Sequence, residues 1–256
     1  MTIRVFAPLA DDYAAARPGY PASVFDALLD RIPGREAGPP PRALDVAAGA
    51  GAATRGLLGR GLRVAAVEPA LEMLRPTVRQ IAVSSGWLGG LAARAEALPV
   101  RDSAAAAIVV AQAFHWLDPD PALEEFARVL VPGGVLLVLW NVTETDSFTS
   151  DVWEIVERFN PGHKRPVTPR MRATPETLAT HAGFNAEPPL EVRHARHLSA
   201  SDYLRYARSW SYVGGAMDRP TLAQFTRRLE RVVASHHGDG PVRERFIAVA
   251  HFARRV

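Results

Sequence analysis

The chain has 256 residues, 48% of them hydrophobic, a size and composition that suit one large α/β domain. The absence of cysteine excludes disulfides, thiolate nucleophiles and cysteine-based metal sites. The net charge is only +3 and the arginines are scattered among acidic residues, so nucleic acid is not an expected partner. The first residues lack the apolar core of a signal peptide, and no apolar run approaches the roughly 18 residues of a membrane span. We therefore expect a cytoplasmic protein without a membrane partner.

Strands alternate with helices through the first 141 residues. This alternation is typical of parallel βαβ units in a doubly wound α/β sheet. One run, 105–111, is apolar throughout, as expected for a strand that is covered on both faces. In chain order, the pattern predicts helices at 9–15, 22–32, 52–58, 70–81 and 118–130, and strands at 43–47, 62–67, 87–93, 105–111 and 135–140.

The second half follows this alternation less closely. Thr174 is a predicted N-cap for a short helix that starts at Pro175 and ends at Gly183. Residues 160–173 carry several charged side chains and predict an exposed loop. The remaining pattern predicts helices at 151–159, 200–213 and 219–236, and strands at 190–198 and 244–254.

A glycine-rich turn at 48–51 joins the first strand to the following helix. Glycine lets the backbone approach a ligand closely and helix N–H groups face it, so such a corner can hold a nucleotide. Glu68 ends the second strand seventeen residues after Gly51, where a carboxylate could accept hydrogen bonds from both ribose hydroxyls. A tight βα turn that binds nothing is the alternative.

Taken in order, these segments resemble the class I S-adenosylmethionine-dependent methyltransferases, in particular the small-molecule group that includes trans-aconitate and ubiquinone/menaquinone-type methyltransferases. The matching segments are Tyr13 with 17–21, 44–51, 67–69 with Met73 and Leu74, 95–99, 111–116, Glu124 with 128–134, and Trp140 with Asn141; 183–184 and 209–212 extend the set weakly.

This resemblance implies a doubly wound, Rossmann-like sheet of seven strands, the last of them antiparallel. It also implies one domain over 1–256. Its predicted parts are an N-terminal lid and first helix at 1–40, a cofactor-binding core at 41–141, and strands with inserted cap helices (about 199–236) at 142–256.

The cofactor residues follow from the same resemblance. Asp45 and the turn with Ala47, Gly49 and Gly51 are assigned to the methionine part of S-adenosylmethionine, and Glu68 to its ribose. The remaining assignments are Met73, Ala95 and Glu96 around the adenine, Pro69 beside them and Gln112 beneath the sulfonium. From their positions at the ends of neighbouring strands, Trp116 and Trp140 could face the sulfonium or a flat substrate. Capping of a turn by Asp45 and core packing by Met73 are the alternatives.

Two positions depart from the family pattern. The family usually has glycine at Ala47 and an acidic residue at Ala106. The methyl group of Ala47 stands where the backbone is expected to lie close to the cofactor, whereas Ala106 replaces a residue with a structural role. These departures leave a non-methylating relative as a possible interpretation.

Methyl transfer requires the acceptor atom to be held about 3–3.5 Å from the methyl carbon, and it requires a base only if the acceptor loses a proton. His115 directly follows the fourth strand and is the predicted base or substrate-orienting residue; Tyr20 is a second catalytic candidate. The predicted acceptor-binding residues are Tyr13, Arg17, His115, Trp140, Trp210 and Tyr212. Packing or solvation is the alternative for each of them.

The expected partner is a small-molecule acceptor, while the sequence leaves monomer and homodimer open. No metal site is predicted, because the other seven histidines lack metal-ligand spacing. The first interpretation is C-, N- or O-methylation of an aromatic or heteroaromatic intermediate of secondary metabolism. Three alternatives remain: formation of a carboxylate methyl ester, an NAD(P)-dependent oxidoreductase, which would use the same corner, and a non-methylating cofactor-binding relative.

Overall fold

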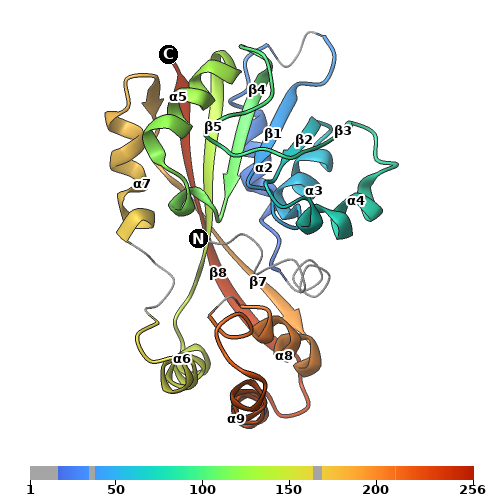
Figure 1. Cartoon of the computed structure of the whole chain (residues 1–256), viewed down its shortest axis with the longest axis vertical. Helices are drawn as coiled ribbons and strands as arrows, with labels where there is room; N and C mark the ends of the chain where they lie inside the picture. Colours follow the sequence, from blue (N-terminus) through green and yellow to red (C-terminus); the bar gives the residue numbers. More distant parts are fainter. Residues whose placement is uncertain (1–16, 35–37, 164–168, 211) are drawn as a thin grey trace.

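The computed structural model describes residues 17–34, 38–163, 169–210 and 212–256 (Figure 1). Its centre is a sheet in the order β3-β2-β1-β4-β5-β8-β6, in which β7 also pairs with β8. The strands are β1 (Arg42–Val46), β2 (Arg63–Val67), β3 (Trp87–Leu91), β4 (Ala105–Ala111), β5 (Leu130–Thr143), β6 (Phe184–Ala186), β7 (Leu190–Leu198) and β8 (Val242–Arg255).

The first five strands are parallel, and β8 is antiparallel to β5. Both β6 and β7 pair with β8, at 253–255 and 242–250 respectively, so these two strands together occupy one edge position of the sheet. The doubly wound sheet with an antiparallel last strand is therefore confirmed.

Helices cover both faces of the sheet. The helices are α2 (Ala22–Leu29), α3 (Ala52–Leu58), η3 (Leu71–Leu74), α4 (Arg75–Ile81), η4 (Phe114–Trp116), α5 (Pro119–Val129), α6 (Ser147–Phe159), α7 (Pro169–Thr180), α8 (Ala200–Arg208) and α9 (Arg219–His237). On one face, α2 and α3 bury Phe25 and Leu57 against the strands, and on the other α5 and α7 bury Phe126 and Leu178. This two-sided burial explains why β4 is apolar along its whole length.

A third apolar cluster lies apart from the sheet and forms a cap. It is built by α6, α8 and α9, which group together beyond the ends of β5 and β8 at the lower end of the molecule (Figure 1). Phe148, Tyr203 and Phe225 are buried at its centre. The strands β5 and β8 are fourteen residues long each, and this length carries the chain from the sheet into the cap.

Several predicted boundaries differ from the structure. The helix α7 begins at Pro169 and contains Pro175, so Thr174 is not its N-cap and residues 169–173 are not loop. Thr174 is fully buried, and packing of this side of the helix outweighs the local preference of a Thr-Pro pair to start one. The run 70–81 is divided into η3 and α4, and β6 was not predicted.

The predicted helix at 9–15 lies outside the described residues. None of the helices in the described part of the chain is long and apolar enough to cross a membrane.

Candidate functional site

The glycine-rich turn lies at the carboxyl end of β1, in the middle of the sheet. Ala47, Gly49 and Gly51 all have positive φ, at 54°, 53° and 68°, and Gly51 is the N-cap of α3. A side-chain carbon placed on Gly49 would meet no atom within 4 Å, so this side of the turn is open to a ligand. The turn itself is closed by the N–H of Gly51, which donates to the carbonyl of Ala48 at 2.8 Å.

Ala47 adopts a backbone conformation that favours glycine. A residue with a β-carbon is strained by about 1 kcal/mol or more at a φ of 54°. Its methyl group is half-buried and packs against the apolar core that includes Leu44 and Val46, which offsets part of this strain. The departure from glycine at this position therefore adds strain in the turn as well as a methyl group.

Glu68 connects the end of β2 to the turn. Its carboxylate accepts hydrogen bonds from the N–H of Gly49 and the N–H of Ala70, both at 3.0 Å. Burial raises the pKa of Glu68, and these two hydrogen bonds lower it in part. Each carboxylate oxygen keeps a lone pair for a further donor, as a hydroxyl-bearing ligand would require.

Asp45 lies beneath the turn and is only 1% exposed. Thr54 on α3 donates a hydrogen bond of 2.5 Å to its Oδ2, while Oδ1 has no hydrogen-bond partner among the described residues. Burial raises the pKa of Asp45 to about 7, because the hydrogen bonds from Thr54 offset only part of the cost of burying the charge.

The residues assigned to the adenine lie along η3 and the segment after β3. Met73 and Ala95 are buried, whereas Pro69 is exposed. Glu96 accepts a hydrogen bond from the N–H of Asp118 at 3.2 Å and pairs with Arg94 at 3.3 Å. In the described structure Glu96 therefore also holds the start of α5 in place.

The end of β4 carries a second strained residue. Gln112 has a φ of 58°, and its amide donates to the carbonyl of Asn141 at 3.1 Å. His115 follows on η4, with its ring 4.5 Å from that of Trp116 and 5.3 Å from that of Trp140. Trp116 is 55% exposed; Trp140 is 2% exposed, and its indole N–H has no hydrogen-bond partner among the described residues.

Trp210 and Tyr212 belong to a group of stacked rings in the cap. The ring of Tyr212 lies 4.0 Å from that of His163, 5.5 Å from that of Trp210 and 5.6 Å from that of Trp153. No pattern in the sequence marks His163 or Trp153 as a site residue. Trp153 offered the signal of an aromatic residue on an amphipathic helix, whereas His163 follows that helix with no recognisable pattern.

Of the predicted lid residues, Tyr13 lies outside the described residues. Tyr20 is half-buried, and its ring meets that of Phe25 edge-on at 6.3 Å. Arg17 lies near the cap. Burial raises the pKa of the Tyr206 and Tyr212 hydroxyls, and the nearby positive charge of Arg17 lowers both pKa values in part. The structure thus brings the segment that contains Arg17 close to the stacked rings.

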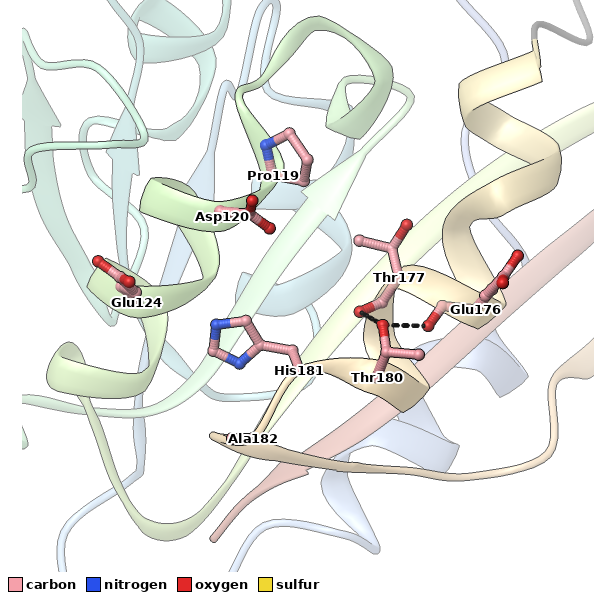
Figure 2. A pocket seen from close by; sticks show the side chains of 8 residues that line it. All are labelled: Pro119, Asp120, Glu124, Glu176, Thr177, Thr180, His181 and Ala182. Atoms are coloured by element: carbon pink, nitrogen blue, oxygen red, sulfur yellow. Dashed lines mark hydrogen bonds between the residues drawn. The ribbon is translucent and has the colours of Figure 1, made fainter.

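A cavity of about 630 Å³ lies elsewhere, between α5 and α7. Figure 2 shows Asp120 and Glu124 on α5 across from Thr177 and from His181 after α7. None of the predicted site residues lines this cavity. The described residues contain no group of His, Asp or Glu side chains that could hold a metal ion.

The chain is similar to known methyltransferases in sequence and in fold. Residues 44–138 match the family model of a methyltransferase domain. An uncharacterised methyltransferase of Mycobacterium tuberculosis is 39% identical over 147 residues, 57% of this chain and 56% of that protein. A ubiquinone/menaquinone biosynthesis C-methyltransferase of Syntrophotalea carbinolica is 37% identical over 101 residues, 38% of this chain and 43% of that protein.

The chain is also similar to a solved structure described as a type II methyltransferase from Anaeromyxobacter dehalogenans. The TM-score is 0.66 at 25% identity, and the match covers 93% of this chain and 97% of that one. With the two sequence relatives, by contrast, the match spans only about half of each relative's length.

Proposed function

We propose that the protein transfers a methyl group from S-adenosylmethionine to a small aromatic or heteroaromatic acceptor, because residues 44–138 match the model of a methyltransferase domain and the fold is similar to that of a solved methyltransferase. The observation that carries this proposal is the carboxylate of Glu68, held by the N–H of Gly49 at the open side of the turn. A carboxylate in this position, beside backbone N–H groups at the carboxyl edge of a parallel sheet, suits the hydroxyls of a ribose.

The chemistry of these residues fits the cofactor. The N–H groups at the start of α3 suit a carboxylate, Glu68 suits the ribose, and the buried acid Asp45 suits the neighbourhood of an ammonium group. When bound, S-adenosylmethionine supplies an activated methyl group. The role of the protein is to orient the acceptor and to exclude water.

The aromatic character of the acceptor is inferred from the rings near the end of β4 and in the cap. The exposed face of Trp116 beside His115 can stack on a flat substrate or on a cation, for about 0.5–2 kcal/mol. The stacked rings around Tyr212 offer a second apolar surface on the cap. His115 either orients the acceptor or removes its proton.

Titration calorimetry with S-adenosylhomocysteine and with NAD tests the cofactor. We expect micromolar binding of the thioether and none of NAD; the reverse result would rule out the proposal. Glu68→Gln should weaken binding at least tenfold, because a neutral amide is a poorer acceptor for the ribose. The matched control is Glu72→Gln, since Glu72 is exposed on η3 and should leave the affinity unchanged.

Incubation with methyl-labelled S-adenosylmethionine and a panel of aromatic and carboxylic acceptors tests the transfer itself. Label in the aromatic acceptors supports the proposal, and label only in carboxylic acids would show ester formation instead. His115→Ala should lower turnover more than it lowers affinity for S-adenosylhomocysteine. An unchanged rate would remove His115 from the mechanism.

A further inference from the structure

Two segments singled out by sequence, 17–21 and the pair Trp140-Asn141, meet in the structure. The side-chain amide of Asn141 donates to the carbonyl of Gly19 at 2.9 Å, across 122 positions of the chain. Its Oδ1 lies 3.0 Å from Nε2 of His194 on β7. The carbonyl of Gly19 needs a donor, so the amide N–H₂ faces Gly19 and Nε2 of His194 carries the proton that Oδ1 accepts.

Through its backbone, Asn141 also contacts the residue that follows β4. Its carbonyl accepts the hydrogen bond from the amide of Gln112, the residue with a φ of 58° at the end of β4. The side chain and the backbone of Asn141 thus hold different parts of the molecule. A change of the side chain removes the bond to Gly19 and leaves the carbonyl that holds Gln112.

The segment that Asn141 holds runs between the sheet and the cap. Pro18 is buried, and the Tyr20 ring packs edge-on against Phe25 of α2. At the other end of the segment, the positive charge of Arg17 lies near the Tyr206 and Tyr212 hydroxyls of the cap and lowers their pKa in part. Residues 17–21 are therefore fixed to α2, to β5 and near the cap.

We propose that Asn141 is a positioning residue that holds 17–21 closed between the end of β5 and the cap, and that it governs acceptor binding and not cofactor affinity. The part about the acceptor rests on the proposed methyl transfer. The geometric reason is that the bond to Gly19 joins the end of β5 to this segment across 122 positions of the chain. His194, stacked on Phe246 at 5.3 Å, fixes the amide in the orientation that donates to Gly19.

Because the chain has no cysteine, a single nitroxide label can report on this segment. Gly19→Cys is a suitable site, since Gly19 is exposed and an added β-carbon meets no atom within 4 Å. Asn141→Asp keeps an oxygen toward His194 but turns a second oxygen toward the carbonyl of Gly19, where the two repel. We expect the electron paramagnetic resonance spectrum to change from restricted in the parent to mobile in Asn141→Asp.

Two further variants separate this effect from general loosening. Asn160→Asp is the matched control, because the Asn160 amide donates to the carbonyl of Tyr212 at 2.9 Å within the cap, and its loss should leave the label restricted. His194→Ala removes the support of the Asn141 amide, together with the stacking on Phe246, but leaves the bond from Asn141 to Gly19, and should give intermediate mobility. If Asn141→Asp does not fold, as judged by far-ultraviolet circular dichroism, Asn141→Ala replaces it with the same expectation.

Calorimetry with S-adenosylhomocysteine completes the test. We expect Asn141→Asp to bind it within about twofold of the parent, and to raise the KM for an acceptor found by the methyl-label panel about tenfold with less effect on kcat. A label that stays restricted in Asn141→Asp, or a tenfold loss of S-adenosylhomocysteine affinity, would overturn the proposal. The spectra are recorded on the free protein and test the role of Asn141 without the cofactor. Failure of the parent to bind S-adenosylhomocysteine would therefore count against the proposed function and not against the role of Asn141.

Discussion

The buried acid Asp45 should make the protein less stable at neutral pH than a variant without its charge. In the folded chain its pKa is about 7, against an ordinary value of 3.8, so the folded state binds the proton more tightly than the unfolded state. The contribution of Asp45 to the free energy of unfolding is therefore largest below about pH 4 and is lost as the pH rises through 7. Asp45→Asn removes this dependence.

The magnitude follows from the two pKa values. A rise from 3.8 to about 7, at about 1.4 kcal/mol per pH unit, amounts to about 4 kcal/mol above pH 7. Over the practical range from pH 5 to pH 8, the contribution of Asp45 falls by about 2.5 kcal/mol. The stability of Asp45→Asn relative to the parent should increase by that amount over the same range.

Urea unfolding followed by far-ultraviolet circular dichroism at four pH values measures this difference. Burial also raises the pKa of Glu68. Glu68 is present in both proteins, so its contribution largely cancels in the difference between their free energies of unfolding. Asp239→Asn is the control for the substitution itself, because it makes the same acid-to-amide change at an exposed position. A difference between Asp45→Asn and the parent that stays constant from pH 5 to pH 8 would refute the reasoning.

Three substitutions test other features of the fold by the free energy of unfolding. Ala47→Gly should stabilise the chain by about 1 kcal/mol, because it relieves the φ of 54°; a loss would mean that the packing of the methyl outweighs the strain. Gly56→Ala should cost about 1–3 kcal/mol in thermal unfolding, because the new carbon falls 2.2 Å from the Phe25 ring, and an unchanged midpoint would contradict this packing. Glu244→Gln should cost about 3 kcal/mol by removing the buried carboxylate that pairs with Arg196, and Glu244→Gln with Arg196→Met should recover most of it; no recovery would show that the pair is not the cause.

The parallel part of the sheet was predictable because its strands contain apolar runs separated by helices. Four of the five parallel strands fall within two residues of their predicted bounds, because burial on both faces requires an apolar pattern that is visible in the sequence; β5 is longer than predicted at both ends, since it starts at Leu130 and ends at Thr143. Helix α7 was misplaced because a Thr-Pro pair is a local signal, whereas the burial of Thr174 depends on elements distant in the chain. The short β6 carries too few residues for any periodicity.

For the candidate site, the sequence by itself determined the turn and the acid that follows it. Gly49, Gly51 and Glu68 are recognisable because positive φ and a carboxylate at the end of a strand are local requirements. Only the tertiary structure decided that Asn141 reaches Gly19. That contact joins residues 122 positions apart, and no local pattern encodes which loop a side chain meets once the sheet has brought the two together.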